Sequence, residues 1–325
     1  MELDAERVRN GLGLDHRFDA FLAEMAALRP SPATLPAADD ARRLLRRMAV
    51  TERDTDEAVD ALPDPVGHPE LWWLLERCRH RLVSDLGGYA WPEPWPHLPR
   101  ELGALGRWFY LAVLLATLPD VRRYHAEHGV SDEVSWATLR DVGEKVALHR
   151  RFHGVGGLDR QDWFTQHFRG SLYALGRLQF HPARVDPQDT GADPDRLPAG
   201  TVVLTVHIPE TGPMTPDACA ESLRRAPGFF ARLGTVASAA TCQSWLLDDQ
   251  LAEYLPADSN IVRFQRRFRP LPVTQESDEA IVGFVFRRTD PDLADLPQRT
   301  TLERAVVTHL RAGRHWRVRA GWLDL

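Results

Sequence analysis

The chain has 325 residues, of which 43% are hydrophobic and 26% charged, and its formal net charge at pH 7 is -6. This composition excludes a disordered or fibrous chain and leaves room for two domains with separate cores. Because proteins that bind the phosphate backbone usually carry a basic domain or stripe, the acidic balance argues against a nucleic-acid partner. Lys145 is the only lysine among the 40 basic residues, a bias typical of GC-rich bacterial coding.

The apolar spacing in the first half of the chain predicts helices. Up to about residue 152, apolar positions recur every three or four residues between proline-rich breaks, which is the pattern of a helical domain. We predict helices over 39–50 and 68–86 and a buried helix over 108–118, which Pro119 should end because proline breaks a helix interior.

From residue 153 onwards the pattern changes and strands alternate with helices. We predict strands at 171–185, 201–208, 235–247, 280–286 and 315–325. Helices are predicted at 158–170, 215–234, 248–255 and 300–313. Strands interleaved with helices indicate an α+β domain built on one mixed sheet flanked by helices.

The cysteine pattern and the apolar stretches indicate in which cellular compartment the protein is expected. Cys78, Cys219 and Cys242 lie far apart without a C-x-x-C pair, which fits a reducing cytoplasm rather than a disulfide framework. No His, Asp and Glu set shows metal-ligand spacing, so we predict no metal.

The longest apolar stretch, WFYLAVLLATL, is well short of the roughly 20 residues that span a bilayer, and the N-terminus has no signal-peptide core. A membrane partner is therefore not expected.

The segment TVVLTVHIPETGPMTPDACAESLRR, residues 201–225, contains a strand, a polar turn and the start of a helix. Such a turn can present backbone N–H groups and the helix dipole to a phosphate, and a plain connector is the simpler alternative. Pro213 and Pro216 remove two donors and Asp217 adds a negative charge, which weakens the phosphate interpretation. Thr215 is a suitable N-cap for the helix.

Several side chains near this turn have two interpretations. Cys242 and His207 fall on neighbouring strands, so the cysteine is either a nucleophile or simply buried. Cys242 and Ser244 share one face of their strand and either line a cleft or pack. Tyr254 is either a general acid or a packed residue at a helix end, and Glu210 is either a base or solvated.

Three stretches resemble a known family. They are HIPETGPMTPDACAESLRRAPGFFARL, CQSWLLDDQLAEYLPADSNIVRFQRRFR and LERAVVTHLRAGRHWRVRAGWLDL. They resemble bacterial acyltransferase-domain proteins that join a helical N-acyltransferase N-terminal domain to a GNAT-like C-terminal domain. The resemblance spans nearly the whole chain and implies domains over 1–152 and 153–325.

The resemblance implies that the strands at 201–208 and 235–247 splay apart and that acyl-CoA or acetyl-CoA, without a metal, enters the gap. The turn at 210–215 would receive the CoA pyrophosphate, although it keeps only Gly212 of the usual Q/R-x-x-G-x-G/A pattern and lacks the flanking Arg or Gln. The residues expected to line the CoA site are Thr211, Gly212, Met214, Thr215, Cys242 and Ser244.

The resemblance also implies direct acyl transfer to an amine acceptor, without a covalent enzyme intermediate. Tyr254 matches the tyrosine that protonates the leaving thiolate, and Glu210 or His207 is the expected base. The acceptor is an unidentified amine, small metabolites included. Two alternatives remain: a non-catalytic GNAT-like protein that senses acyl-CoA or another nucleotide-containing ligand, and a Cys-dependent acyl carrier or hydrolase.

Overall fold

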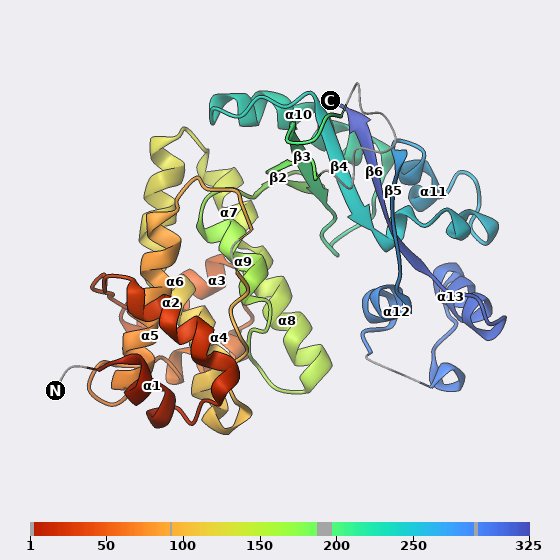
Figure 1. The fold of residues 1–325 in the computed structure, drawn as a ribbon. Helices are drawn as coiled ribbons and strands as arrows, with labels where there is room; N and C mark the ends of the chain where they lie inside the picture. Colours follow the sequence, from red (N-terminus) through yellow and green to blue (C-terminus); the bar gives the residue numbers. More distant parts are fainter. Residues whose placement is uncertain (1–2, 92, 187–196, 289–291) are drawn as a thin grey trace. The chain divides into compact units, whose positions relative to one another are not determined.

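The structure is a computed structural model that describes residues 3–91, 93–186, 197–288 and 292–325. The chain divides into two compact units, Met1–Tyr173 and Ala174–Leu325. Figure 1 follows the chain through helices in the first unit and a sheet with helices in the second. The helices of the first unit are α1 (Ala5–Gly11), α2 (Asp19–Ala27), α3 (Ala38–Arg47), α4 (Glu52–Asp60), α5 (Pro69–Ser84), α6 (Gly103–Glu127), α7 (Asp132–Leu139), α8 (Asp141–His153) and α9 (Gln161–Phe168).

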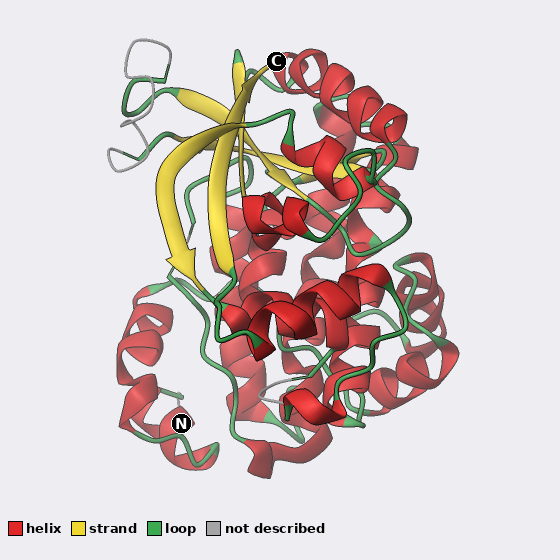
Figure 2. Cartoon of the chain, turned by 90° about the vertical axis from the view of Figure 1, so that its right-hand side faces the viewer, coloured by secondary structure: helices red, strands yellow, loops and turns green. Residues whose placement is uncertain are grey.

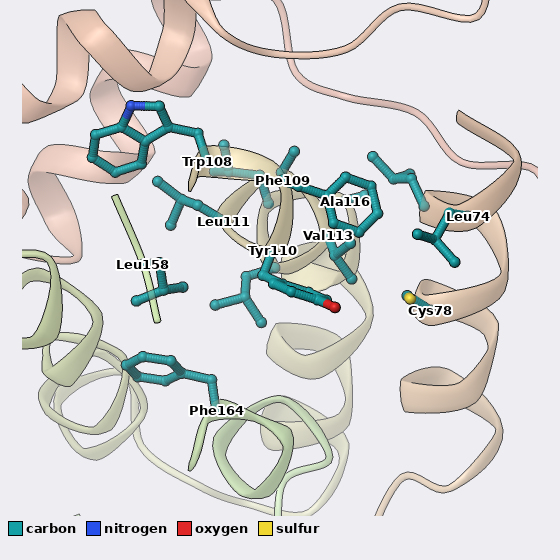
Figure 3. Close-up of a cluster of buried hydrophobic side chains, with 14 of the residues drawn as sticks. Leu74, Cys78, Trp108, Phe109, Tyr110, Leu111, Val113, Ala116, Leu158 and Phe164 are labelled. Carbon is teal, nitrogen blue, oxygen red and sulfur yellow. The ribbon is translucent and has the colours of Figure 1, made fainter. Parts of the chain in front are cut away.

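Helix α6 forms the core of the helical unit. Every residue from Trp108 to Leu118 is buried, and Figure 3 shows this helix packed against Leu74 and Cys78 of α5 and against Phe164 of α9. A helix that is apolar on all sides must be buried in protein or in a membrane. By length and composition the segment Arg100–Glu127 would also cross a membrane, but 61% of its apolar window is buried inside the protein, as in the core helix of a globular domain.

The prediction that Pro119 ends this helix is wrong, because α6 continues through it to Glu127. Proline in a helix interior removes one backbone hydrogen bond and costs roughly 3 kcal/mol. The nearby side chains of Leu118 and Val121 are both buried, and burying an aliphatic side chain contributes about 1.5 to 3 kcal/mol. Burial on both sides of the proline therefore offsets the lost hydrogen bond.

The division between the units also lies later than the sequence pattern indicates. The pattern places it near residue 152, whereas the compact units divide between Tyr173 and Ala174. Helix α9 belongs to the helical unit because Phe164 and Phe168 are fully buried in the same hydrophobic cluster as Trp108. The change from helices to strands therefore comes after α9.

The second unit is built on a six-stranded sheet in the order β1-β2-β3-β4-β6-β5. Its strands are β1 (Tyr173–Leu175), β2 (Leu178–Arg184), β3 (Val202–His207), β4 (Ala239–Ser244), β5 (Arg269–Glu276) and β6 (Arg317–Asp324). Strands β3 and β4 are parallel, and the β2–β3, β4–β6 and β5–β6 pairs are antiparallel. Figure 2 shows the strands gathered in one twisted sheet. This mixed sheet confirms the predicted α+β class.

The helices of this unit lie between the strands along the chain. They are α10 (Pro216–Arg232), α11 (Asn260–Gln265), α12 (Asp278–Phe286) and α13 (Thr301–Arg311), with the short 3₁₀ helices η4 (Trp245–Leu247), η5 (Asp249–Glu253) and η6 (Leu293–Asp295). Helix α10 begins as predicted, because the Thr215 side chain accepts a hydrogen bond from the backbone N–H of Ala218 and Pro216 occupies the first helical position.

The prediction of a strand at 280–286 is wrong, because this run lies in helix α12. A short apolar run does not by itself distinguish a strand from a helix, and here the N-cap decides: the Ser277 side chain accepts a hydrogen bond from the N–H of Ala280, and Asp278 and Glu279 lie in the first turn. The sequence analysis also missed β5, whose Pro270 argues against a central strand. This strand lies at the edge of the sheet, where proline is tolerated.

Candidate functional site

Strands β3 and β4 separate at their carboxyl ends. Among the described residues their Cα partners are Leu204 with Ala240 and Thr205 with Thr241. Beyond these pairs β3 continues to His207 and β4 to Ser244. No β3–β4 partners follow these pairs among the described residues, which is the pattern that the expected splay of the two central strands predicts.

The sheet has a polar face at this position. His181 is the register partner of Thr205, and Gln179 is the partner of His207, so these four side chains point to the same side of the sheet. Thr241 of β4 joins them, because it is the partner of Thr205 and its Oγ1 lies 3.4 Å from Thr205 Oγ1. A polar row thus crosses β2, β3 and β4 where β3 and β4 begin to separate.

Two histidines of this row are in direct contact. His181 Nδ1 lies 2.7 Å from His207 Nε2, and the rings stack with centroids 4.9 Å apart. His181 is only 1% exposed, whereas His207 is half-buried at the end of β3. One of the two nitrogens donates and the other accepts, depending on the tautomer. If His207 donates from Nε2, its Nδ1 carries the lone pair that a general base needs.

Cys242 and Ser244 lie on the opposite face. Leu204 and Ala240 are partners, so Cys242, two residues after Ala240, shares their apolar side of the sheet. Cys242 is 1% exposed, and burial raises the pKa of its thiol to about 12. A thiol with that pKa is not a thiolate at pH 7, and the thiolate is the nucleophile. The Ser244 hydroxyl accepts a hydrogen bond from the N–H of Leu246 and caps η4.

The turn after β3 contains Glu210, Thr211, Gly212, Met214 and Thr215. Gly212 has φ 71, a left-handed conformation that glycine adopts without strain. Met214 is buried, while Thr211 and Gly212 are exposed. Glu210 is half-buried, and its Oε2 lies 2.7 Å from Arg287 Nη2. Glu210 is therefore engaged with a cation, whereas His207 contacts His181.

Two arginines from elsewhere in the chain reach the same turn. Arg177, between β1 and β2, donates from Nη2 to the Gly212 carbonyl at 3.1 Å and from Nε to the Pro213 carbonyl at 3.3 Å. Arg267, after α11, donates from Nη2 to the Pro216 carbonyl at 2.8 Å. The turn sequence lacks its own flanking cation, and tertiary folding supplies Arg177 and Arg267 in addition to Arg287, which pairs with Glu210. The sequence analysis missed them because they are distant along the chain.

Tyr254 follows η5 and binds a buried histidine. Its hydroxyl lies 3.0 Å from His309 Nδ1, and His309 Nε2 lies 3.3 Å from the His315 carbonyl. A carbonyl only accepts, so Nε2 carries the proton, and Tyr254 donates to Nδ1. Burial lowers the pKa of His309, in agreement with a neutral ring. Arg314 Nη1 donates to the same hydroxyl at 3.4 Å.

The structure brings some predicted site residues together and separates others. His207 ends β3, and Glu210 and the turn residues follow it directly. Cys242 lies on the other face of the sheet, and the hydroxyl of Tyr254 is directed to α13. The histidine partner His181 is the addition that the sequence analysis missed. Its signal was a histidine in a run of buried strand residues, where an unpaired polar group is costly.

Comparison with known proteins gives matches over almost the entire chain. Residues 39–170 match the N-acyltransferase N-terminal domain, and residues 172–323 match the GNAT-like C-terminal domain. No curated protein matches.

Solved structures with similar folds cover the chain from end to end. One is an acyltransferase in complex with decanoyl-CoA and teicoplanin, 47% identical, with a TM-score of 0.92 over 99% of this chain and 100% of that one. Another is an acyltransferase in complex with CoA and 10C-Teicoplanin, 46% identical, with the same TM-score of 0.92 and coverage of 99% and 100%. A third, also 46% identical with a TM-score of 0.92 and coverage of 99% and 100%, is a tryptophan-to-alanine acyltransferase mutant in complex with octanoyl-CoA.

Proposed function

Because this chain belongs to the acyltransferases that join an N-acyltransferase N-terminal domain to a GNAT-like C-terminal domain, we propose that it transfers a medium-length acyl group to an amine of a small molecule of the teicoplanin kind. The relatives are acyltransferases bound to acyl-CoA, which confirms the predicted enzyme class and the predicted co-substrate. The amine, the acyl length and the roles of individual residues are our proposals. The complexes of the relatives with octanoyl-CoA, decanoyl-CoA and teicoplanin support the acyl length and the acceptor. The histidine pair at the end of β3 supports the assignment of the base.

The first step is binding of the donor at the turn. We place the CoA pyrophosphate against Thr211, Gly212, Met214 and Thr215, at the amino end of α10, where the helix dipole favours an anion. Pro213 and Pro216 remove backbone donors there. The guanidinium groups of Arg177 and Arg267, which bind carbonyls of this same segment, compensate with positive charge.

The second step positions the thioester in the gap between β3 and β4. Beyond Thr241 the edge of β4 that faces β3 has no β3 partner among the described residues. Its backbone N–H groups are the donors that we assign to the thioester carbonyl, where they would stabilise the negative charge of the tetrahedral intermediate. Gln243 supplies the backbone groups of this edge: the N–H of Leu325 donates to the Ser238 carbonyl, so the even-numbered residues of β4 pair with β6. The side chains of Cys242 and Ser244 point to the apolar face.

The third step is attack by the amine. We assign the base to His207 Nδ1, with His207 Nε2 donating to His181 Nδ1. The amine nitrogen attacks the thioester carbon, its proton passes to His207, the carbon–sulfur bond breaks, and CoA leaves as a thiolate that takes up a proton. His181 accepts the same hydrogen bond in both protonation states of His207 and so fixes the tautomer, as the orienting member of a triad does.

Tyr254 is the proposed proton source for the thiolate. At rest its proton is directed to His309 Nδ1, so the hydroxyl has to turn away from His309 to deliver it. Arg314, 3.4 Å from the hydroxyl oxygen, would stabilise the phenolate left behind. A thiol has a pKa near 8.5, so CoA is a moderate leaving group and the assistance required is correspondingly small.

The direct test is a transfer assay. Wild-type protein is incubated with acetyl-, octanoyl- or decanoyl-CoA, with and without teicoplanin, and free CoA is followed with a thiol reagent while the acceptor is analysed by mass spectrometry. We expect CoA release that depends on the acceptor and a mass gain of one acyl group. A thermal shift with acyl-CoA but no transfer to teicoplanin or to other amines would overturn the proposed acceptor and leave donor binding intact.

We also propose a cytoplasmic location. The three cysteines are free and buried, which suits a reducing compartment, and CoA thioesters are intracellular metabolites.

A further inference from the structure

The helical unit contains a cluster of potential metal ligands. Its residues are far along the sequence from those of β3 and β4. His149 and His153 of α8 and Asp159 each offer one ligand atom, and these atoms all lie within 4.8 Å of one another. We propose that these three residues bind a divalent transition-metal ion, with zinc as the preferred ion. This site has no part in the acyl-transfer steps described above.

The helix and its end create this arrangement. His149 and His153 are four residues apart on α8, so they project from the same face, and their ring centroids are 4.4 Å apart. The helix ends at His153, and Gly154 has φ 73, a left-handed cap that reverses the chain direction. The returning segment brings Asp159 Oδ2 to 3.2 Å from His153 Nε2.

His149 is oriented as a metal ligand should be. It is 7% exposed, and its Nδ1 lies 3.0 Å from the Val155 carbonyl. The carbonyl only accepts, so Nδ1 carries the proton and the lone pair lies on Nε2. A backbone carbonyl that binds the second ring nitrogen is the usual support for a histidine ligand.

The backbone of Gly157 passes close to this ring. A Cβ atom at Gly157 would lie 2.9 Å from His149 Nε2 and 2.7 Å from Cε1, so a larger residue there would displace the ring. A substitution at Gly157 would therefore disturb the position of His149.

The donor set selects the ion. Two imidazoles and one carboxylate suit zinc, cobalt or nickel, whereas magnesium and calcium prefer oxygen ligands only. Donor atoms around one tetrahedral zinc ion stand about 3.3 Å apart. The His153–Asp159 pair is already at that distance, and both side chains are partly exposed, at 44% and 32%. They can therefore adjust toward His149 and leave a fourth position to water.

The sequence signal for this site was the H-x-x-x-H spacing of residues 149 and 153, which is incomplete without a third ligand. Asp159 is six residues beyond His153 and comes close only because the chain reverses after α8. The proposed role is structural: the ion would tie the end of α8 to the segment that leads into α9.

The test uses untagged full-length protein that has been treated with a chelator and desalted. Zinc is titrated by calorimetry, and cobalt is titrated by its visible absorption, which is intense for tetrahedral sites. We expect one ion per chain and at least a tenfold weaker affinity in His153→Ala and in Asp159→Asn. Both positions are partly exposed, so both variants should fold, which far-ultraviolet circular dichroism checks.

His68→Ala is the matched control. His68 and Asp64 form a histidine–carboxylate pair in the turn before α5, 3.2 Å apart, without a third ligand among the described metal-binding groups. Its loss should leave zinc affinity unchanged. Failure to bind one equivalent of zinc or cobalt, or binding that survives both His153→Ala and Asp159→Asn, would overturn the proposal.

Discussion

His181 Nδ1 lies 2.7 Å from His207 Nε2, across the antiparallel pair of strands β2 and β3. One partner is buried and the other stands at the end of β3, where the sheet opens. A fixed, buried histidine behind a half-buried one restrains the tautomer and the ring orientation of the outer residue. This arrangement supports the proposal that His207 is the base.

The first prediction concerns the base. His207→Gln should lower kcat by about 10²-fold or more, because positioned general bases typically contribute 10²- to 10⁴-fold. Donor binding should persist, with a similar thermal shift on addition of decanoyl-CoA. His128→Gln is the control, since His128 is an exposed residue of the helical unit. A wild-type rate in His207→Gln would rule out His207 as the base and leave Glu210 to be tested.

The second prediction separates His181 from His207. His181→Asn keeps a side chain with a hydrogen-bonding group but loses the ring, so His207 should remain present and less well oriented. We expect kcat to fall by about tenfold with little change in the KM for acyl-CoA, because the proposed base is present but less well oriented. An unchanged kcat together with a lower melting temperature would indicate that His181 only packs.

A third prediction distinguishes direct transfer from Cys-dependent chemistry. Cys242→Ser should retain kcat within a few-fold for the folded protein, because the thiol is buried and burial raises its pKa to about 12. Thiol-reactive reagents should leave the native enzyme active, and intact-protein mass spectrometry should detect no acyl-enzyme. Complete loss of activity in a Cys242→Ser protein that still melts cooperatively would restore the covalent mechanism.

The fourth prediction addresses donor binding through Arg177. Arg177→Gln removes a guanidinium that binds two carbonyls of the turn. A charge-assisted contact contributes about 1.5 kcal/mol, so the KM for acyl-CoA should rise by about tenfold, with a smaller change in kcat. Arg184→Gln serves as the control, since Arg184 is exposed at the end of β2. Equal KM values in both variants would remove Arg177 from the donor site.

The fifth prediction is the pH dependence of stability from Asp141. This carboxylate is 3% exposed. Burial alone would raise its pKa, but His167, Lys145 and the indole N–H of Trp163 outweigh burial, so its pKa in the folded protein lies well below the usual value. Stability from a depressed carboxyl pKa is complete above the unfolded pKa of about 3.9 and is lost as the pH falls toward the folded value.

Urea unfolding at several pH values measures this contribution. Asp141→Asn should lower the free energy of unfolding by about 2 to 3 kcal/mol at pH 7, and the difference from wild type should shrink below about pH 4. Asp132→Asn is a control, since Asp132 forms its ion pairs on the surface. A difference that stays constant down to pH 2 would mean that the charge of Asp141 is not what stabilises the fold.

The sixth prediction is a decrease in kcat of about 10²-fold in Tyr254→Phe, measured at saturating donor and acceptor. The variant removes the proposed proton source and keeps the ring that packs against His309 and Trp316. His309→Gln should leave most of the rate in place, because His309 only receives the resting proton. A decrease below threefold in Tyr254→Phe would assign the tyrosine a packing role.

Local signals in the sequence determined the elements that carry the site. Alternating and apolar runs marked β2, β3 and β6, and the Thr215 cap with Pro216 marked the start of α10, because these patterns depend on neighbouring residues only. The local patterns misled in two places. Pro119 lies within α6 because the surrounding core compensates for it, and 280–286 lies in α12, whose local Ser277 cap the sequence analysis overlooked.

Tertiary structure alone decided which side chains meet. The register of β2 against β3 puts His181 next to His207 and Cys242 on the other face of the sheet, and a shift by one residue would reverse every side chain. Arg177 and Arg267 reach the turn, and Asp159 reaches α8, by folding rather than by proximity in sequence. Pairings of this kind depend on long-range packing, which residue patterns along one chain do not encode locally.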